Sequence, residues 1–139
     1  MSKKIVAKMQ DLQFKVGELV QLNLAFHNLN KATEDNLGLS LVQYYLLNLL
    51  RDMPGCAPQR LANAAGMHPS TLTQSMKRFL RKKLIYVEED PRDSRKKILG
   101  ITICGHTALI KFEENVERLF HIHEETTNKL SLKLKVMQN

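Results

Sequence analysis

Prolines and glycines divide residues 54–69 into short segments, and this spacing limits the possible folds more than any other feature of the sequence. A Pro-Gly pair opens the stretch and ends the apolar helix before it, because proline cannot continue a helix. Pro58 suits the first position of a short helix, and Gly66 suits the position just after its end. Pro69 then opens a further helix that runs to about Lys83. Two helices joined by so tight a turn predict a helix-turn-helix.

A narrow apolar stripe predicts one long helix over residues 5–30. Its members recur at spacings of three and four: Ile5, Met9, Leu12, Val16, Leu19, Asn23 and Phe26. A stripe of this width fits packing against one other helix, and its single polar member, Asn23, can fix the register of such a pair. The sequence alone leaves open whether the second helix belongs to a second copy or to the same chain.

The remaining elements follow from capping residues and from side chains typical of strands. Ser40 stands where an N-cap belongs before the apolar run LVQYYLLNLL, and Thr102 stands where one belongs before a last long helix. Residues 84–90 and 97–104 are rich in β-branched and aromatic side chains and have a turn-prone polar stretch between them, so they predict a β-hairpin. The tail KLSLKLKV alternates as a strand would, but we expect a short helix there.

The net charge of +7 is distributed unevenly along the chain. From Met53 to Val87 there is no Asp or Glu. The same segment holds the bases Arg60, Lys77, Arg78, Arg81, Lys82 and Lys83. Such a segment repels itself unless it is solvated or meets a polyanion. Nucleic acid is the expected polyanion, and the alternatives are an anionic membrane surface and a plain excess of surface lysine.

The chain is long enough for a single domain. Its 139 residues can bury a sizeable core. The sequence contains no apolar run of membrane-spanning length and no secretory signal, so we expect a cytoplasmic protein without a membrane span. Cys56 and Cys104 lack the spacing of a zinc site or of a disulfide scaffold.

The helix that opens at Pro69 has two chemically distinct faces when projected at about 100° per residue. The predicted inner face is apolar and consists of Leu72, Met76, Phe79 and Leu80. The outer face carries hydroxyl, amide and cationic groups without any acid. Hydroxyls and amides can pair with base edges in a DNA major groove, whereas cations suit phosphates. We therefore expect contacts with base edges or adjacent phosphates from Ser70, Thr71, Thr73 and Gln74. Contacts with the DNA backbone are expected from Lys77 and Arg78.

The hairpin tip, DPRDSRKK at residues 90–97, follows that helix closely and can reach a flanking minor groove. Narrow A·T tracts in that groove attract arginine strongly. We expect Arg92 or Arg95 to enter the minor groove. We expect Lys96 and Lys97 to bind phosphates. Carboxylates cannot face phosphate favourably. Asp90 and Asp93 are therefore expected to accept backbone N–H groups within the turn and to orient an arginine.

In this order, the pieces resemble the MarR (multiple antibiotic resistance regulator) family of winged-helix transcription factors across about residues 39–109. The most specific part is DxRDxR in the hairpin, followed by the helix start T-x-x-G. The resemblance implies a mainly α (α+β) fold in a single domain, 1–139. It places a winged helix-turn-helix at 36–102 and long dimerisation helices at 5–35 and 103–139.

The same resemblance implies a homodimer that places one winged helix on each half of a pseudo-palindromic operator in double-stranded DNA. Family members commonly act as repressors and leave DNA on binding a small phenolic ligand or on cysteine oxidation. A small-molecule effector is therefore expected, and Cys56 or Cys104 is the candidate for oxidation. Lys83 departs from the family pattern, because a glycine usually ends the recognition helix there. A left-handed backbone costs lysine about 1 kcal/mol.

Catalytic and metal-binding patterns are weak in this sequence. Cys104 and His106 are too small a constellation to specify a nucleophile and its base, so we expect no enzyme activity and no cofactor. Glu117, His121 and Glu125 share a helical face that fits a divalent metal, but the same spacing makes ordinary surface pairs. We therefore expect no metal site.

The lining of an effector pocket cannot be identified from the sequence. His27 and Tyr44 are candidates, but core packing explains them as well. The alternative function of a different class is a winged helix that binds an acidic protein partner or holds an assembly together. Salt dependence and preference for one duplex distinguish this alternative from DNA reading.

Overall fold

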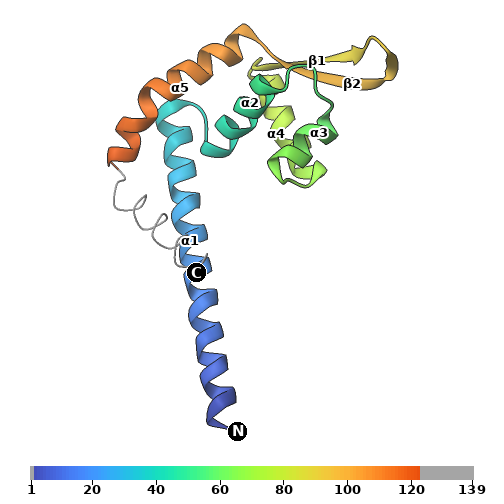
Figure 1. Ribbon diagram of the computed structural model, residues 1–139. Helices are drawn as coiled ribbons and strands as arrows, with labels where there is room; N and C mark the ends of the chain where they lie inside the picture. Colours follow the sequence, from blue (N-terminus) through green and yellow to red (C-terminus); the bar gives the residue numbers. More distant parts are fainter. Residues whose placement is uncertain (1, 123–139) are drawn as a thin grey trace.

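The computed structural model describes residues 2–122, which form five α-helices and one two-stranded antiparallel hairpin (Figure 1). In chain order the elements are α1 (Lys3–Leu37), α2 (Leu41–Asp52), α3 (Pro58–Ala65), α4 (Pro69–Arg81), β1 (Ile85–Asp90), β2 (Asp93–Ile101) and α5 (Ile103–Ile122). The expected mainly α, winged helix-turn-helix fold is confirmed. The helix expected in the tail, and the part of the expected segment 103–139 that follows residue 122, lie outside the described residues.

Helix α1 projects away from the other elements (Figure 1). It continues to Leu37 instead of ending near residue 30, because Gly38 (φ 81°) takes the left-handed conformation that closes a helix. Its apolar stripe is exposed in the single chain, at Ile5, Met9, Leu12, Val16, Leu19 and Phe26. The described part of the chain therefore does not cover this stripe. Neither α1 nor any other described helix is long and apolar enough to span a membrane.

Local capping contacts set several helix boundaries. Ser40 and Gln43 form a reciprocal capping box at the start of α2. Gly66 (φ 66°) closes α3 in the left-handed conformation. At the start of α5, the Thr102 hydroxyl accepts the N–H of Gly105 at 3.0 Å. The N-caps predicted at Ser40 and Thr102 are therefore confirmed.

The hydrophobic core lies where α2, α3, α4, α5 and the base of the hairpin meet. From α2 it takes Leu46, Leu47 and Leu50, each at most 2% exposed, because three- and four-residue spacing puts them on one side of the helix. Phe79 of α4 and Phe112 of α5 are equally buried. This shared core holds the second helix of the helix-turn-helix against the hairpin.

The hairpin has a shorter tip than the sequence analysis predicted. Ile85 lies opposite Ile101, and the register shifts between Glu89 and Asp90. Residues 91 and 92 alone connect the strands, so the stretch 93–97 belongs to β2 instead of to the tip. The base of β2 is also tied to the connection between α2 and α3, because Gly55 N–H donates to the Leu99 carbonyl at 3.0 Å.

Helix α4 ends at Arg81, short of the predicted end at Lys83. Lys83 has φ 59° and is the single described non-glycine residue with positive φ. The Leu84 N–H donates to the Phe79 carbonyl at 2.9 Å across it, which is the hydrogen bond of a Schellman helix end. Leu80 was expected on the inner face but is 43% exposed. At about 100° per residue it lies about 80° from Leu72, at the edge of that face.

Candidate nucleic-acid interface

A tight turn between α3 and α4 sets the direction of α4. Ala62 is fully buried, and its small side chain allows the two helices to cross closely. Its carbonyl accepts the N–H of Met67 at 3.0 Å, just after the left-handed Gly66. The imidazole Nδ1 of His68 then accepts the N–H of Ser70 at 3.2 Å and caps α4. The turn therefore aims the first turn of α4 outward.

The outer face of α4 is open to solvent. Leu72 and Phe79 are each 2% exposed on the inner face. All six residues assigned to DNA on this helix are exposed: Ser70, Thr71, Thr73, Gln74, Lys77 and Arg78. The side chains of Gln74, Lys77 and Arg78 form no hydrogen bond or ion pair with other described residues. Their donors are therefore available to a ligand.

Two hydroxyls at the start of α4 are held by local contacts. Ser70 Oγ lies 2.7 Å from His68 Nδ1, and Thr73 Oγ1 donates to the Pro69 carbonyl at 2.9 Å. Both hydroxyls keep lone pairs that point away from these partners and can accept a hydrogen bond. The contacts orient the two groups without burying them.

In the hairpin turn, two carboxylates bind the backbone. Asp90 accepts the N–H of Arg92 at 2.9 Å, and Asp93 accepts the N–H of Arg95 at 3.1 Å. Asp93 also accepts from the Arg95 guanidinium, at 3.1 Å from Nε and 3.3 Å from Nη2. The Arg95 side chain, followed by the Arg95 N–H, lowers the pKa of the Asp93 carboxyl. The two carboxylates therefore hold the backbone of the turn, and Asp93 also orients the Arg95 side chain.

The wing cations differ in how free they are. Arg92 lies in the turn itself, and its side chain forms no hydrogen bond or ion pair with the other described residues. Arg95 and Lys96 are exposed on β2, and Arg95 is held by its aspartate. Lys97 Nζ lies 3.7 Å from the Glu89 carboxylate on the neighbouring strand. Exposed pairs of this kind contribute little energy, so Lys97 can exchange its partner for a phosphate.

The helix-turn-helix and the hairpin lie on the same side of α2. Figure 1 shows the hairpin extending beyond α3 and α4, on the side of the molecule away from α1. Helix α4, which carries the acid-free face, and the hairpin, which carries the wing cations, are therefore neighbours in one subunit, and α4 contacts β1. Local spacing predicted the face of α4, whereas the place of the hairpin beside it depends on the core.

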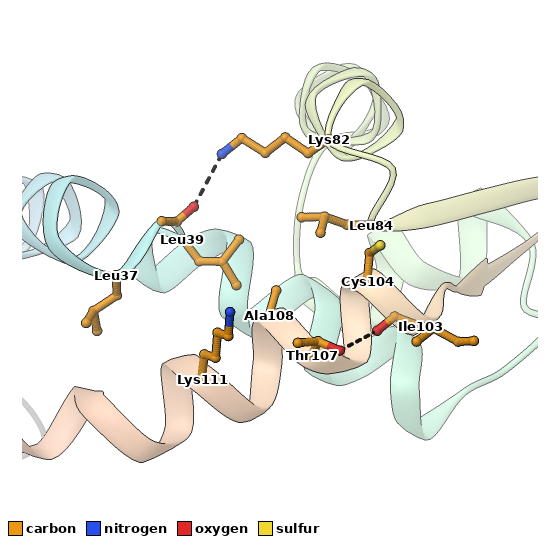
Figure 2. A pocket seen from close by; sticks show the side chains of 10 residues that line it. Leu37, Leu39, Lys82, Leu84, Ile103, Cys104, Thr107, Ala108 and Lys111 are labelled. Carbon is orange, nitrogen blue, oxygen red and sulfur yellow. Dashed lines mark hydrogen bonds between the residues drawn. The ribbon is translucent and has the colours of Figure 1, made fainter.

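A cavity of about 360 Å³ lies between the ends of α1 and α4 and the start of α5 (Figure 2). Its lining consists of Leu37, Gly38, Leu39, Lys82, Leu84, Ile103, Cys104, Thr107, Ala108 and Lys111. The wall is mostly apolar, with the ammonium groups of Lys82 and Lys111 reaching it from different elements. No periodic signal marks these residues in the sequence, because three separate segments supply them.

His27 and Tyr44, the two residues that the sequence suggested for an effector pocket, lie outside this cavity. Tyr44 stacks on Phe112, with 4.5 Å between ring centroids, and its hydroxyl donates to Glu113 at 3.2 Å. Burial, and then the Glu113 carboxylate, raise the pKa of Tyr44. His27 is exposed on α1. Neither residue lines the cavity.

The two cysteines have different environments. Cys56 is buried, and burial raises the pKa of its thiol despite the opposing charge of Arg60. A thiol in that state is a poor target for oxidation. Cys104 is exposed and lines the cavity. The structure therefore separates the two oxidation candidates.

Metal-ligating side chains do not gather within the part of the chain that the structure describes: no group of three His, Cys, Asp or Glu could hold an ion there. Glu117, one of the three residues that the sequence analysis considered as ligands of a divalent metal, is exposed on α5. The side chain of His121 and the whole of Glu125 lie outside the description. That triad remains untested.

A helix-turn-helix followed directly by a two-stranded wing defines a winged helix-turn-helix protein. Residues 37–96 match the model of the MarR family. This match covers 60 of the 139 residues and includes the helix-turn-helix and most of the wing, the part of the chain that carries the resemblance. No curated protein matches the sequence.

Solved structures share the fold at low sequence identity. PcaV of Streptomyces coelicolor has 23% identity and a TM-score of 0.69, over 88% of this chain and 94% of that one. A mutant of MarR from E. coli, complexed with operator DNA, has 17% identity and a TM-score of 0.67 over 88% of each chain. BpsR of Bordetella bronchiseptica has 20% identity and a TM-score of 0.67, over 87% of this chain and 90% of that one. In BpsR, 6-hydroxynicotinic acid regulates DNA binding.

Proposed function

We propose that this protein is a sequence-specific regulator of transcription that binds double-stranded DNA and acts as a repressor. The observation that carries the proposal is the exposed, acid-free face of α4 beside a cationic wing. An ordinary solvated helix face in a chain with this composition carries acids among its bases. The match of residues 37–96 to the MarR family model supports the same function.

In this proposal, α4 lies in the major groove. The Gln74 amide can form two hydrogen bonds with adenine, and Ser70, Thr71 and Thr73 meet base edges or adjacent phosphates. Lys77 and Arg78 hold the DNA backbone. The wing takes the flanking minor groove, with the following cations: Arg92 or Arg95 in the groove, and Lys96 and Lys97 on phosphates.

The homodimer is proposed to form through the terminal helices of one domain, 1–139. Segments 5–35 and 103–139 would pair with their counterparts, and segment 36–102 of each copy would meet one half of a pseudo-palindromic operator. The exposed apolar stripe of α1 supports this, since solvent-exposed apolar patches of that length usually mark an interface.

The effector is proposed to bind in the cavity between α1, α4 and α5. Apolar walls with two ammonium groups suit a small apolar molecule that carries an acidic group. The acid that regulates BpsR is of this chemical kind. Cys104, which lines the same cavity, is the candidate for a redox signal.

Selection of bound sites from a random duplex pool tests the function. We expect an enriched inverted repeat, with at least about 10³-fold preference over random duplex and a steep loss of affinity as salt rises. A protein-binding winged helix would enrich no sequence. It would instead be captured by an acidic protein partner.

Two substitutions distinguish residues that recognise bases from residues that only hold the DNA backbone. Gln74→Ala should change sequence preference at one base pair, at a cost of about 1–3 kcal/mol at that position. Arg95→Ala should weaken binding to all duplexes and leave the selected sequence unchanged. Gel-shift titration against the selected site and a scrambled duplex measures both. Intact binding in both variants would contradict the assignment of helix and wing.

A further inference from the structure

A second recess, of about 260 Å³, lies between α1 and the C-terminal end of α4. One acidic and three basic side chains line it: Glu34, Arg78, Arg81 and Lys82. The acid comes from α1, and the bases come from the recognition helix and its C-cap. The recess is therefore a place where α1 and the proposed DNA-reading helix share one electrostatic environment.

The positive charge of this recess is not neutralised by ion pairs. Among the described residues, Glu34, Arg78 and Arg81 form no ion pair within 4.0 Å. Lys82 Nζ donates to the Gly38 carbonyl at 3.3 Å, a neutral partner at the end of α1 (Figure 2). Both α1 and α4 end beside the recess, and their C-terminal dipoles, worth about half a negative charge each, offset part of the positive charge of the bases. Three bases against one acid leave an excess of positive charge.

This arrangement suits one class of ligand. Guanidinium groups present planar pairs of N–H donors that match the oxygens of a phosphate group, and an ammonium adds a third donor. A bare carboxylate on the rim repels the same oxygens. We propose that the recess binds a phosphate group and that Glu34 holds its affinity down.

The phosphate group has two possible sources. If it belongs to the DNA backbone, which rests on the proposed function, Arg81 and Lys82 extend the contacts of α4 beyond Lys77 and Arg78. Glu34 then links the dimerisation helix to the strength of DNA binding. If it belongs to a free phosphorylated molecule, the recess is a separate anion site. The chemistry at the protein is the same.

The first measurement uses inorganic phosphate. Titration of the full chain at constant ionic strength, followed by the NMR signals of the arginine Nε–H groups, should show saturable shifts for Arg81. Glu34→Gln should tighten this binding about two- to fivefold. Asp35→Asn is the matched control, because it removes the same charge from a neighbouring exposed residue outside the recess lining. It should change affinity much less.

The second measurement identifies the source. If the DNA backbone occupies the recess, Arg81→Gln should reduce the salt slope of duplex binding by about 0.9, the value for one phosphate. An unchanged slope, together with saturable phosphate binding, assigns the recess to a free anion. Thermal melting checks that each variant folds.

Two results separate the failures. Absence of saturable phosphate binding with an unchanged salt slope overturns the recess, and sequence-specific binding by the unmodified protein would still support the proposed function. Saturable phosphate binding by a protein that selects no duplex overturns the proposed function and leaves the recess standing. Equal effects of Glu34→Gln and Asp35→Asn would overturn the role of Glu34.

Discussion

At the scale of single residues, Lys83 has the least favourable backbone of the described chain. Its φ of 59° is one that lysine adopts at a cost, because its Cβ crowds the backbone. The position is nevertheless well determined: the Lys83 carbonyl accepts from the Thr102 hydroxyl at 2.6 Å, and the Leu84 N–H completes the helix end. Tertiary contacts therefore impose the conformation on the residue.

Replacement of Lys83 by glycine should stabilise the protein. Glycine adopts positive φ without strain, and after its larger unfolded-state entropy is subtracted we expect a gain of about 0.5–1 kcal/mol in the free energy of unfolding. Denaturant unfolding measures it. Lys83→Ala removes the same charge but keeps the Cβ, so it should give no such gain. An equal gain in both variants would mean that charge, not backbone, is responsible.

Asp93 offers a pH-dependent test of the wing. Because its pKa is lowered in the folded state, its pair with Arg95 is fully present above the ordinary aspartate pKa and is lost as pH falls through the lowered value. We expect the Asp93 carboxyl ¹³C signal to titrate below the ordinary value of about 3.9. In Arg95→Ala the midpoint should move back up. The same midpoint in both proteins would show that the pair does not form in solution.

At the scale of elements, the start of α5 packs closely against the backbone at Leu84 because Gly105 has no side chain. A Cβ built at Gly105 would lie 2.2 Å from the carbonyl oxygen of Leu84, a backbone atom that cannot swing aside. This close approach places Thr102 and the first turn of α5 against the backbone that connects α4 to β1. The cavity between α1, α4 and α5 opens at the same junction.

Gly105→Ala should therefore destabilise the fold. Overpacking of this kind costs about 1–3 kcal/mol, because the helix start must move away from Leu84. Gly17→Ala in α1 is the matched control. Nothing lies within 4 Å of its built Cβ, so the better helix propensity of alanine should add about 0.5–1 kcal/mol. Urea unfolding of the two variants should thus give opposite signs, and a loss in both would contradict this reading.

At the scale of the whole molecule, α1 is the element that the described chain covers least, because only its C-terminal part packs on α2 and α5. A helix of 35 residues is about 52 Å long, and most of its length packs on nothing in the single described chain. Such a helix is not stabilised by propensity alone. A second copy is the partner that the proposed function supplies.

Leu12→Asp should weaken the proposed dimer. Leu12 is 62% exposed in the single chain and belongs to the apolar stripe, so a charge there would be buried on association. We expect the dimer dissociation constant to rise at least about tenfold, measured by sedimentation velocity. Gln10→Asp places the same charge outside the stripe and should have little effect. An unchanged monomer–dimer equilibrium in Leu12→Asp would remove α1 from the interface.

The sequence by itself determined what depends on neighbours along the chain. The caps at Ser40 and Thr102, the turn at Gly66 and the outer face of α4 follow from local hydrogen bonding and helical periodicity, and each of these elements is found in the structure. Burial is only partly local, which is why Leu80, at the edge of the apolar face, was expected inside but is 43% exposed.

Tertiary structure decided what depends on segments far apart in the chain. Glu34 and Arg81 line one recess, and Leu37 and Lys111 line one cavity, although no spacing connects them. The short turn of the wing was decided in the same way, because strand pairing extends β2 into residues that look like loop. The physical reason is that periodicity specifies which face a residue takes, whereas packing of the core specifies which faces meet.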